Sequence, residues 1–491
     1  MSTQKSKDFQ KWGVLLTTLV ASVTVIMNAS LQNVAVPQYI KTFDITTVKA
    51  QWIISLFSLC FLIAMTVAPY FAKKYGYRNI FLGGIVFLTG GAFVGGFAPT
   101  FEIMLLARIF QGLGGGLITP ICLVLIRENF GIEKQGFAMG LWSFSNMLAP
   151  AIAPIVGGLI LENSSWNYLF FANIPAIVLC FISVLIFLRG YNKKSTEVNI
   201  FDWLGFILIS IGLVSLVFAI EQVQKPVQPY MPYVLFTVAI VCLTSFVFHS
   251  LKGKQPLLNV RILKNTLFTS SLIIVACCSF TMTSLTFIVP ILMQQVLGVG
   301  PTLSGMATLP HALMVGVFGI VGGTLLDKYG PKTAIYPGLL VLLGAAFFIF
   351  FTLDTLPIWA IIVCIGMIGV GNGMLSTTTV ATALSKVNQN QLREGASMVN
   401  IVKHIGKVII VVVVAFIYDG RKVHYLAGNY AEGQAGMAAI QDVYLFLGGF
   451  LLLMLPVVWL ICKKYKEQVT YSSLSEDELF VEKDSKPILQ R

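Results

Sequence analysis

The sequence has 491 residues, of which 56% are hydrophobic and only 11% are charged. A soluble globule of this size needs more polar surface than such a chain supplies, so the composition excludes a soluble protein and indicates an integral membrane protein. Lys and Arg outnumber Asp and Glu by 33 to 21, and in a membrane protein this excess is tested first as a topological signal.

The cysteines and the N-terminus carry no sign of a bound group or of processing. All eight cysteines lie within or at the edge of apolar segments, and neither a disulfide framework nor a metal-ligand spacing is visible. The polar N-terminus, 1–12, precedes an apolar run that is too long for a signal peptide and lacks a small-residue cleavage site. We therefore expect no cofactor, no metal site and a retained first span.

The apolar segments predict the number of membrane spans. A helix needs about 20 apolar residues to cross a bilayer core of about 30 Å. Fourteen spans are predicted, at 13–36, 51–72, 80–98, 103–126, 136–161, 166–188, 204–222, 231–250, 267–292, 303–326, 333–353, 357–380, 395–417 and 439–462. The predicted fold class is an all-α integral membrane protein.

The basic residues support this count. If both termini are cytoplasmic, 25 of the Lys and Arg residues fall in inner segments. Five fall in outer loops, namely Lys41, Lys49, Lys225, Arg421 and Lys422. The remaining three, Arg108, Lys403 and Lys407, lie inside predicted spans. The positive-inside rule demands this distribution, so the basic excess needs no nucleic-acid partner.

The sequence also contains an internal repeat. The stretch "PYFAKKYGYRNIFLGG" after the second predicted span and "GTLLDKYGPKTAIYPG" after the tenth share a K-Y-G pattern between apolar runs. Parallel repeats of this kind place a substrate path at the interface between two halves. A simpler interpretation is that any short inner loop needs Gly and Lys for a tight, positively charged turn.

Together with two membrane motifs, these loops resemble the major facilitator superfamily, specifically its fourteen-span drug:proton antiporters of the QacA/EmrB type. The likeness covers about residues 13–462. The second loop is similar to the family's G-x-L-A-D-R-x-G-R-K signature through Gly323, Asp327, Lys328, Gly330 and Lys332. The fourth span, "RIFQGLGGG", resembles the family's R-x-x-Q-G-x-G element through Arg108, Gln111, Gly112 and Gly114.

The fifth span resembles the family's antiporter motif, G-x8-G-x3-G-P-x2-G-G. The matching residues are Gly140, Pro154, Gly157 and Gly158, whereas Ala149 and Ala153 replace two of the glycines. Small residues let helices approach closely and proline bends a helix, so Pro150 and Pro154 predict a bent, tightly packed span suited to a rocking interface.

The resemblance implies a major facilitator fold with two six-helix halves plus two extra central helices. The expected halves are 13–188 and 267–462, joined by a linker, 189–266, that contains the two extra spans. The N-terminus, 1–12, and a charged tail, 463–491, are expected in the cytoplasm, the tail being disordered.

The two loop copies differ at the position of the family's aspartate. In the second copy, Asp327 can accept hydrogen bonds from a helix N-terminus or pair with a neighbouring cation, and either contact would latch one state, with Lys328 and Gly330 completing the loop. In the first copy, which carries Gly76 and Arg78, Lys73 takes that position, so a carboxylate latch is not expected there. We predict asymmetric gating, the alternative being that Lys73 and Arg78 only anchor the topology.

The first span departs from the family pattern in its charge. "IMNASLQNVAVP" resembles L-D-x-T-x-x-N-V-A-x-P through Asn33, Ala35 and Pro37, but Asn28 replaces the aspartate and cannot carry a proton. No other carboxylate is expected near the membrane midplane. Arg108 needs a partner or water in hydrocarbon unless it snorkels to the interface, and Gln111 is its neighbour in the motif.

The thirteenth span carries the most unusual charges. Lys403 and His404 match a basic-polar pair that the family has at the start of this span, and such side chains can snorkel toward the cytoplasm. If the helix starts near Gly395, Lys407 lies about 18 Å deep. Two ammonium groups one turn apart repel, so their face should meet water, an anion or both. A structural lysine bound to a carbonyl or a tyrosine is the alternative.

These charges change the expected substrate. An electropositive cavity without a central acid favours anionic or zwitterionic solutes, and Trp142, Phe144 and Tyr168 are candidates for an apolar wall. His404 or a buried Lys407 is then the candidate proton carrier. The function is predicted to be secondary active transport, most simply proton-linked efflux of amphipathic organic compounds or drugs from a prokaryotic cell across its cytoplasmic (inner) membrane.

Other functions are less well supported by the sequence. Uptake or export of a specific anionic metabolite, such as a siderophore or carboxylate, is the runner-up. A membrane enzyme is not expected because no HExxH, paired carboxylates or Ser-His-Asp grouping is visible, and a sensor would need a larger soluble domain. The expected partners are a small-molecule substrate, protons and the lipid bilayer, with a periplasmic adaptor as a candidate in a Gram-negative cell.

Overall fold

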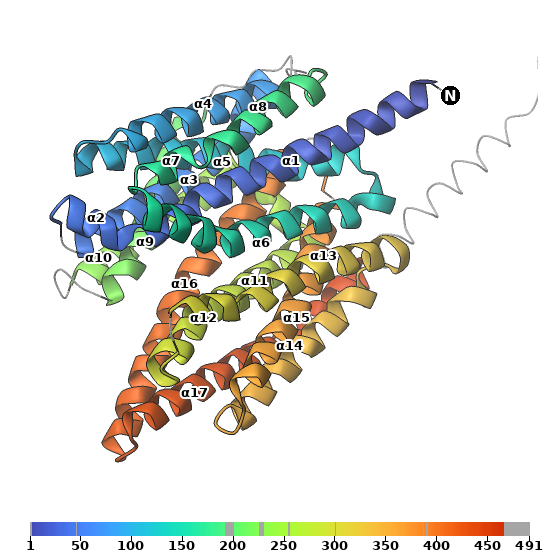
Figure 1. The fold of residues 1–491 in the computed structure, drawn as a ribbon. Coiled ribbons are helices and arrows are strands. Elements are labelled where there is room, and N and C mark those ends of the chain that lie inside the picture. Colours follow the sequence, from blue (N-terminus) through green and yellow to red (C-terminus); the bar gives the residue numbers. More distant parts are fainter. Residues whose placement is uncertain are drawn as a thin grey trace, which may run out of the picture.

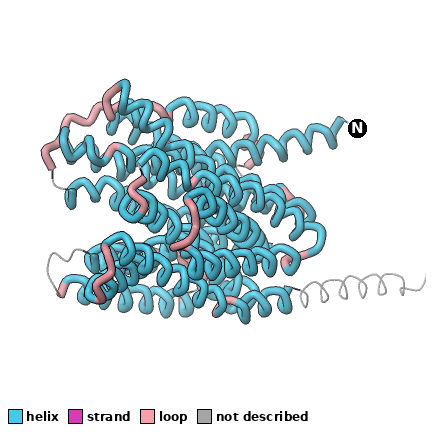
Figure 2. The backbone as a smooth tube through the Cα atoms, turned by 60° about the horizontal axis from the view of Figure 1, so that its bottom comes forward, coloured by secondary structure: helices cyan, strands magenta, loops and turns pink. Residues whose placement is uncertain are grey.

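The structure, a computed structural model, describes residues 2–45, 47–191, 201–224, 230–253, 256–299, 301–385, 387–388 and 391–465. The described residues form helices joined by short loops, with no strand among them (Figure 2). Helices satisfy every interior backbone donor and acceptor within one segment, which a chain in hydrocarbon requires. The tail from residue 466 lies outside the described residues, so the prediction of disorder is not tested.

The helices have the following bounds. In the first part of the chain they are α1 (Ser2–Val34), α2 (Val36–Thr42), α3 (Thr47–Tyr75), α4 (Tyr77–Gly96), α5 (Phe101–Asn129), α6 (Ile132–Asn163), α7 (Tyr168–Phe171), α8 (Ile174–Phe187), α9 (Trp203–Gln224) and α10 (Met231–Lys252). In the second part they are η1 (Val260–Lys264), α11 (Thr266–Pro290), the π-helical η2 (Ile291–Val296), α12 (Pro301–Ala307), α13 (Leu309–Tyr329), α14 (Lys332–Thr352), α15 (Ile358–Ser385), α16 (Leu392–Ala427) and α17 (Glu432–Leu452).

Fourteen of the described helical segments are long and apolar enough to cross a membrane, which confirms the predicted number of spans. The thirteenth differs most from its prediction, because α16 runs from Leu392 to Ala427 rather than over 395–417. Its extension carries Arg421 and Lys422, which pair with Asp442 and Glu432 at 2.5 and 3.2 Å. These cations therefore lie on a helix that continues past the apolar stretch, not in a loop.

The helices form two groups with an additional pair. Helices α1 to α8, the N-terminal half, lie together in Figure 1, and α11 to α17, the C-terminal half, form a second group below them. The halves meet where α6 packs against α13 and where α16 packs against α3 and α5. The extra helices α9 and α10 pack against each other, and α9 also contacts α3 and α16.

The two predicted loop copies adopt the same turn. Gly76 is the single residue between α3 and α4, and Gly330 directly follows α13. Each has a φ of 82°. Only glycine adopts this left-handed region without strain. The conformation supports the predicted repeat and explains why both copies have glycine after Lys-Tyr. We call the side of the bundle that holds these two loops the latch face.

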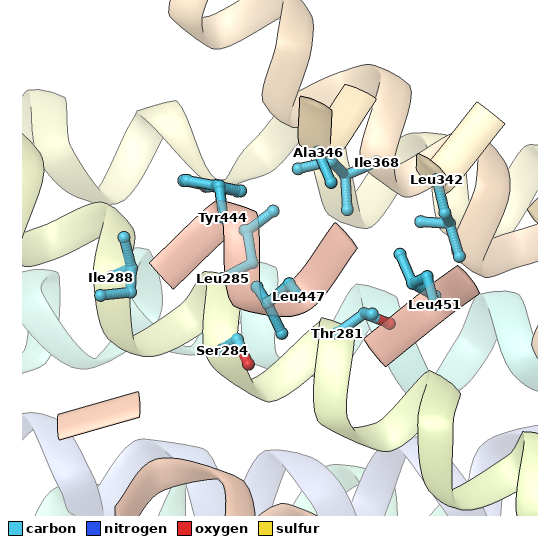
Figure 3. Close-up of a pocket in the computed structure, with 10 residues that line it drawn as sticks. All are labelled: Thr281, Ser284, Leu285, Ile288, Leu342, Ala346, Ile368, Tyr444, Leu447 and Leu451. Carbon is cyan, nitrogen blue, oxygen red and sulfur yellow. The ribbon is translucent and has the colours of Figure 1, made fainter. Parts of the chain in front are cut away.

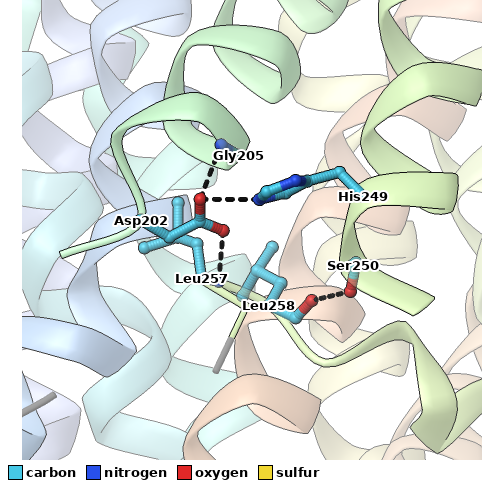
Figure 4. Close-up of polar contacts among 6 residues, drawn as sticks. All are labelled: Asp202, Gly205, His249, Ser250, Leu257 and Leu258. Atoms are coloured by element: carbon cyan, nitrogen blue, oxygen red, sulfur yellow. Dashed lines mark hydrogen bonds and ion pairs between the residues drawn. The ribbon is translucent and has the colours of Figure 1, made fainter. Parts of the chain in front are cut away.

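A group of polar contacts around Asp202 joins the two extra helices to the segment that leads to the C-terminal half (Figure 4). Asp202, just before α9, accepts a hydrogen bond from the backbone N–H of Gly205 at 2.8 Å and from that of Leu257 at 3.0 Å. The same carboxylate lies 2.8 Å from Nε2 of His249, at the end of α10. One side chain thus caps α9 and joins it to α10 and to the segment that leads to α11.

Candidate functional site

Arg108 is buried inside the N-terminal half, with 1% of its surface exposed. Its Nε donates to the carbonyl oxygen of Ile53 at 2.8 Å, and one terminal nitrogen donates to Oε1 of Gln111 at 2.7 Å and to Oδ1 of Asn28 at 3.3 Å. The guanidinium also lies 4.4 Å from the centre of the Phe57 ring. Arg108 therefore does not snorkel to the interface, and α1, α3 and α5 hold it between them.

This arrangement holds a cation with neutral groups alone. A guanidinium in a dry interior is costly unless its donors are hydrogen-bonded, and here carbonyl and amide oxygens accept from Nε and from one terminal nitrogen. Nearby, the Tyr39 hydroxyl donates to Oε1 of Gln32. Burial raises the pKa of Tyr39 despite the opposing charge of Arg108, so this hydroxyl stays neutral. Asn28 stands where the family that the sequence resembles has aspartate. Because its amide carries no charge, it does not neutralise the positive charge of Arg108.

A row of aromatic rings leads from Arg108 to the C-terminal half. Phe57 stacks on Phe61, also on α3, with ring centres 5.7 Å apart. Phe61 in turn contacts the His404 ring of α16, at 4.8 Å. Since α3 and α16 belong to different halves, this contact places His404 at their interface, about 18 Å along α16 from its start.

Lys403 also reaches the N-terminal half. Its Nζ lies 5.5 Å from the centre of the Trp142 ring on α6. The Trp142 indole N–H donates to Oγ of Ser22 on α1 at 2.6 Å, which fixes the ring. Trp142, one of the three aromatic residues expected to form an apolar wall, therefore lies beside Lys403. Phe144 instead packs where α6 crosses Gly316 of α13, and Tyr168 lies exposed on α7.

Lys407 has a different environment from the other two intramembrane cations. It follows Lys403 by four residues and His404 by three, so it shares the helix face that these two turn toward the N-terminal half. Its side chain is exposed, and within the described part of the chain it has no hydrogen-bond or ion-pair partner. Because α16 starts at Leu392, three residues before the predicted start at Gly395, Lys407 lies about 22 Å along the helix from its start.

No described carboxylate neutralises these cations. Acidic side chains on the described spans lie toward helix ends, at Glu102, Glu128, Glu162, Asp327 and Glu394, or where the end of α16 meets α17, at Asp419, Glu432 and Asp442. The side chains of Glu133 and Glu221 lie outside the described residues. The described arrangement can therefore attract an anion, and its described residues offer no carboxylate to a cationic solute.

The second loop copy joins the two halves at the latch face. Asp327, near the end of α13, accepts hydrogen bonds from the backbone N–H groups of Gly136 and Phe137 in the first turns of α6, at 2.8 and 2.9 Å. These two amides lie near the start of α6, where the helix dipole favours a negative charge. Lys328, the next residue, is exposed and takes no part in this contact.

Close backbone packing accompanies this carboxylate. A Cβ added at Gly136 would lie 2.1 Å from the carbonyl oxygen of Gly323, and one at Gly140 would lie 2.6 Å from the Cα of Ile320. No side chain larger than hydrogen fits at either position. Gly140 of the antiporter motif is thus part of the contact between the halves.

The rest of the antiporter motif lies elsewhere on α6. Gly157 packs against Val34 and Leu31 of α1 at ordinary distances, and Gly158 has open space beside it. Pro150 is exposed. The side chains of Pro154 and of Asn33 lie outside the described residues.

The first loop copy meets α16 through charge. Lys73 interacts electrostatically with Glu394, the third residue of α16, whose Oε2 is buried without a hydrogen-bond partner. The first loop itself supplies no carboxylate, but Glu394 of the facing helix lies within electrostatic range of Lys73, and the asymmetric gating stays a prediction. Arg78, in the same loop, buries its Nε without a partner.

Further hydrogen bonds cross between the halves at the latch face. Arg127 of α5 donates to the carbonyl oxygens of Leu384 and Ser385 at the end of α15, at 3.3 and 2.8 Å. Arg393 of α16 donates to the Tyr77 hydroxyl at 2.9 Å, which donates to Glu128 at 2.6 Å. The structure is therefore closed on this side.

A sequence model of the Major Facilitator Superfamily matches residues 18–411. The chain belongs to the Major Facilitator Superfamily. It is a multi-pass membrane transporter and not an enzyme.

Relatives in this superfamily are named for drug resistance. Lincomycin resistance protein LmrB of Bacillus subtilis is 28% identical over 343 residues, which cover 69% of this chain and 71% of LmrB. LmrB of Listeria monocytogenes is 24% identical over 88% of this chain and 93% of its own length. These matches agree with the predicted resemblance to drug antiporters.

The fold of the superfamily is also found in solved structures. The crystal structure of the human organic anion transporter MFSD10 superposes with a TM-score of 0.61, covering 90% of this chain and 99% of that chain at 11% sequence identity. At this identity the likeness shows the shared fold and no more.

Several site residues were missed by the sequence reasoning. Phe57 and Phe61 give no signal, because phenylalanine is common in any membrane span. Glu394 lies at a predicted span start, where an acid indicates no more than a helix-end charge. His311, buried in α13, does carry a signal in the sequence, because it is an ionisable side chain inside a predicted span.

Asn28→Asp tests whether the uncharged partner of Arg108 at position 28 matters for the binding of an anion. From the sequence, an aspartate at position 28 is expected to pair with Lys407, but the structure puts the side chain at this position 3.3 Å from the Arg108 guanidinium. We expect an ion pair with Arg108 that lowers the positive potential at the interface between the halves and weakens the binding of an organic anion by roughly tenfold. The affinity for an organic anion in detergent solution is the measurement.

Asn28→Ala, which removes the oxygen without adding charge, is the matched control and should weaken anion binding less. An unchanged affinity in Asn28→Asp would show that Arg108 does not contribute to the potential that a substrate meets.

Proposed function

We propose that this transporter exports amphipathic organic compounds from the cytoplasm by alternating access in exchange for protons, and that its cavity prefers anionic or zwitterionic solutes. One observation carries the preference. Lys407 presents an exposed ammonium group without a partner among the described residues, on the helix face that also places Lys403 and His404 against the N-terminal half.

The surrounding charges support this preference. Arg108 and Lys403 add positive charge, and the described spans have no acid near them. In a site that excludes most water, Coulomb attraction between unlike charges is several times stronger than in bulk water. An anion gains from all three cations, whereas a cation is repelled by all three.

Export is supported by the relatives named for lincomycin resistance. The contacts at the latch face supply one closed gate of an alternating-access cycle, held by Asp327 and by Arg127. The runner-up, transport of one specific anionic metabolite such as a siderophore or carboxylate, is favoured by the spacing of Lys403 and Lys407, because one helical turn suits a single compact anionic group.

Reconstitution into liposomes with an imposed pH gradient tests the proposal. The solute panel should share one aromatic scaffold and vary in charge and in size. Proton-linked accumulation of several amphipathic anions supports broad export. Accumulation of one compact carboxylate alone would favour the runner-up, and absence of any response to the pH gradient would contradict proton linkage.

The proposed topology puts the latch face, both termini and the loop 251–266 in the cytoplasm, following the distribution of Lys and Arg. Lys252 is exposed at the end of α10 and Lys41 is exposed in α2, at the opposite ends of spans. In intact cells, we expect a membrane-impermeant maleimide to label Lys41→Cys and not Lys252→Cys.

Permeabilised cells should allow labelling of Lys252→Cys, and the unmodified chain gives the background from the native cysteines. Labelling of Lys252→Cys from outside intact cells would invert the proposed topology.

A further inference from the structure

A second buried polar network lies inside the C-terminal half. His311 of α13 has 7% of its surface exposed, and its Nε2 lies 3.4 Å from Nδ2 of Asn372 on α15. Oδ1 of the same Asn372, which is fully buried, accepts a hydrogen bond from the Thr281 hydroxyl of α11 at 2.6 Å. The amide donates to the imidazole, so Nε2 acts as an acceptor and the ring is neutral in this arrangement.

This network corresponds to the one that holds Arg108. Both networks use the first, second and fourth spans of their half, α1, α3 and α5 in one case and α11, α13 and α15 in the other. The register also agrees, because Asn28 precedes Pro37 by nine residues and Thr281 precedes Pro290 by nine. The N-terminal half therefore shows that neutral oxygens at this place in the repeat can hold a buried cation.

His311 has no charged neighbour of its own among the described residues. Helix α15 contributes one titratable side chain, Cys364, and α12 contributes none. Helix α11 brings Cys277 and Cys278 near Thr281. The other described titratable groups on α13 itself and on α6 and α14, which pack against it, lie toward helix ends or the latch face, namely Asp327, Lys328, Tyr329, Lys134, Glu162, Lys332 and Tyr336.

A small cavity lies at the other end of the network (Figure 3). Thr281 and Ser284 of α11 line it together with Tyr444 of α17 and apolar side chains of α14 and α15, and its volume is about 20 Å³. That is room for one water molecule, which needs polar partners such as these hydroxyl groups. The network therefore leads from His311 to a space that can hold water.

We propose that His311 binds the proton that this transporter exchanges for its substrate. The inference rests on the proposed proton-linked export and adds the group that carries the proton. A hydronium ion from the aqueous phase gives its proton to Nε2 of the neutral ring, which leaves water and an imidazolium with two N–H donors, and release of the proton to water restores the neutral ring. The first span has no aspartate at position 28 to bind a proton. In this proposal, His311 in the C-terminal half takes that role.

Protonation requires the network to rearrange. A protonated Nε2 can no longer accept from Asn372, so the amide turns over and presents Oδ1 to the ring. Thr281 then loses its acceptor, but the carbonyl oxygen of Cys278 lies 3.0 Å from the same hydroxyl and can replace it. The proton thus changes the contacts that join α11, α13 and α15.

The same helix connects this change to the gate. His311 lies in the first turn of α13 and Asp327 near its last residue, with the close glycine contacts to α6 in between. A shift of α13 that follows protonation therefore acts on the hydrogen bonds between Asp327 and the start of α6. This is a physical route by which proton binding biases the latch.

His311→Gln keeps a hydrogen-bonding side chain and removes the titration. The probe is a fluorescent aromatic carboxylate that the wild-type protein transports. A gradient of one pH unit can drive about tenfold accumulation through one exchanged proton, and we expect the variant to lose it while keeping counterflow without a gradient. Proton release on anion binding, followed with an indicator dye in weakly buffered detergent solution, should fall from about one per protein to near zero.

His424→Gln, on the exposed extension of α16, is the matched control and should behave as wild type. Full gradient-driven accumulation and proton release in His311→Gln would overturn the inference, as would loss of counterflow in a folded variant, which would make His311 structural or substrate-binding. If the wild-type protein itself ignores the pH gradient, the proposed proton linkage fails, and this inference fails with it.

Discussion

Lys407→Ala is expected to abolish transport while the protein remains folded and inserted in the membrane. Truncating one partner of a desolvated charge pair costs about 2 kcal/mol or more, which corresponds to at least about 30-fold in affinity. The structure offers no protein partner for this ammonium among the described residues. Removing it therefore breaks no internal contact and eases insertion into the membrane.

Two further variants at this position distinguish two roles of Lys407, a fixed positive charge that binds the anion and a group that carries the proton. Lys407→Arg keeps the cation and should retain partial transport, including its response to the pH gradient, whereas Lys407→Gln should behave like Lys407→Ala. Guanidinium does not deprotonate in proteins, so failure of Lys407→Arg would assign the proton to Lys407. Wild-type transport rates in Lys407→Ala would show that the ammonium group is dispensable for structure and function. This result would contradict the proposed preference for anions.

Asp327→Asn is expected to impair transport much more than Lys73→Ala. The amide has one acceptor oxygen, so it can satisfy only one of the two backbone N–H groups of Gly136 and Phe137, and it loses the charge that the start of α6 stabilises. We expect a loss of about 2 kcal/mol in the closed state and a transport rate reduced by roughly tenfold or more. Lys73 acts on Glu394 through charge alone, so Lys73→Ala breaks no hydrogen bond between the halves and should cost less.

Transport assays at matched expression measure this difference, with thermal stability in detergent as the check for folding. Glu394→Gln is the companion of Lys73→Ala and should have a similarly small effect if the two act only as a screened pair. Equal loss from Asp327→Asn and Lys73→Ala would show that the charge pair at the start of α16 is a latch of the same strength, and the predicted asymmetry would be wrong.

The fold was predictable because its determinants are local and repetitive. Apolar stretches of the required length, separated by Lys and Arg, define the fourteen spans without any tertiary contact. The Lys-Tyr-Gly repeat pointed to two related loops, and Gly76 and Gly330 share one conformation. The end of α16 was not predictable, because a helix can continue past the apolar stretch and pair its charges with α17.

The site was predictable only in part, for a different reason. Cations in apolar segments stand out in any sequence, so Arg108, Lys403 and Lys407 were found. Their partners come from helices far apart in the chain: Asn28 lies beside Arg108 and not Lys407, and Glu394 faces Lys73. Hydropathy and motif spacing carry no information on such pairings, because they depend on which faces of which helices meet.

The central claim is that the space between the two halves is an anion site whose free charge is Lys407. Uptake of one aromatic scaffold, bearing either a carboxylate or an amine, into liposomes with wild-type protein tests it most directly. The account predicts that the carboxylate is transported at least about tenfold faster at low concentration than the amine, as expected for three cations that no described acid neutralises. Equal rates, or faster transport of the amine, would contradict it.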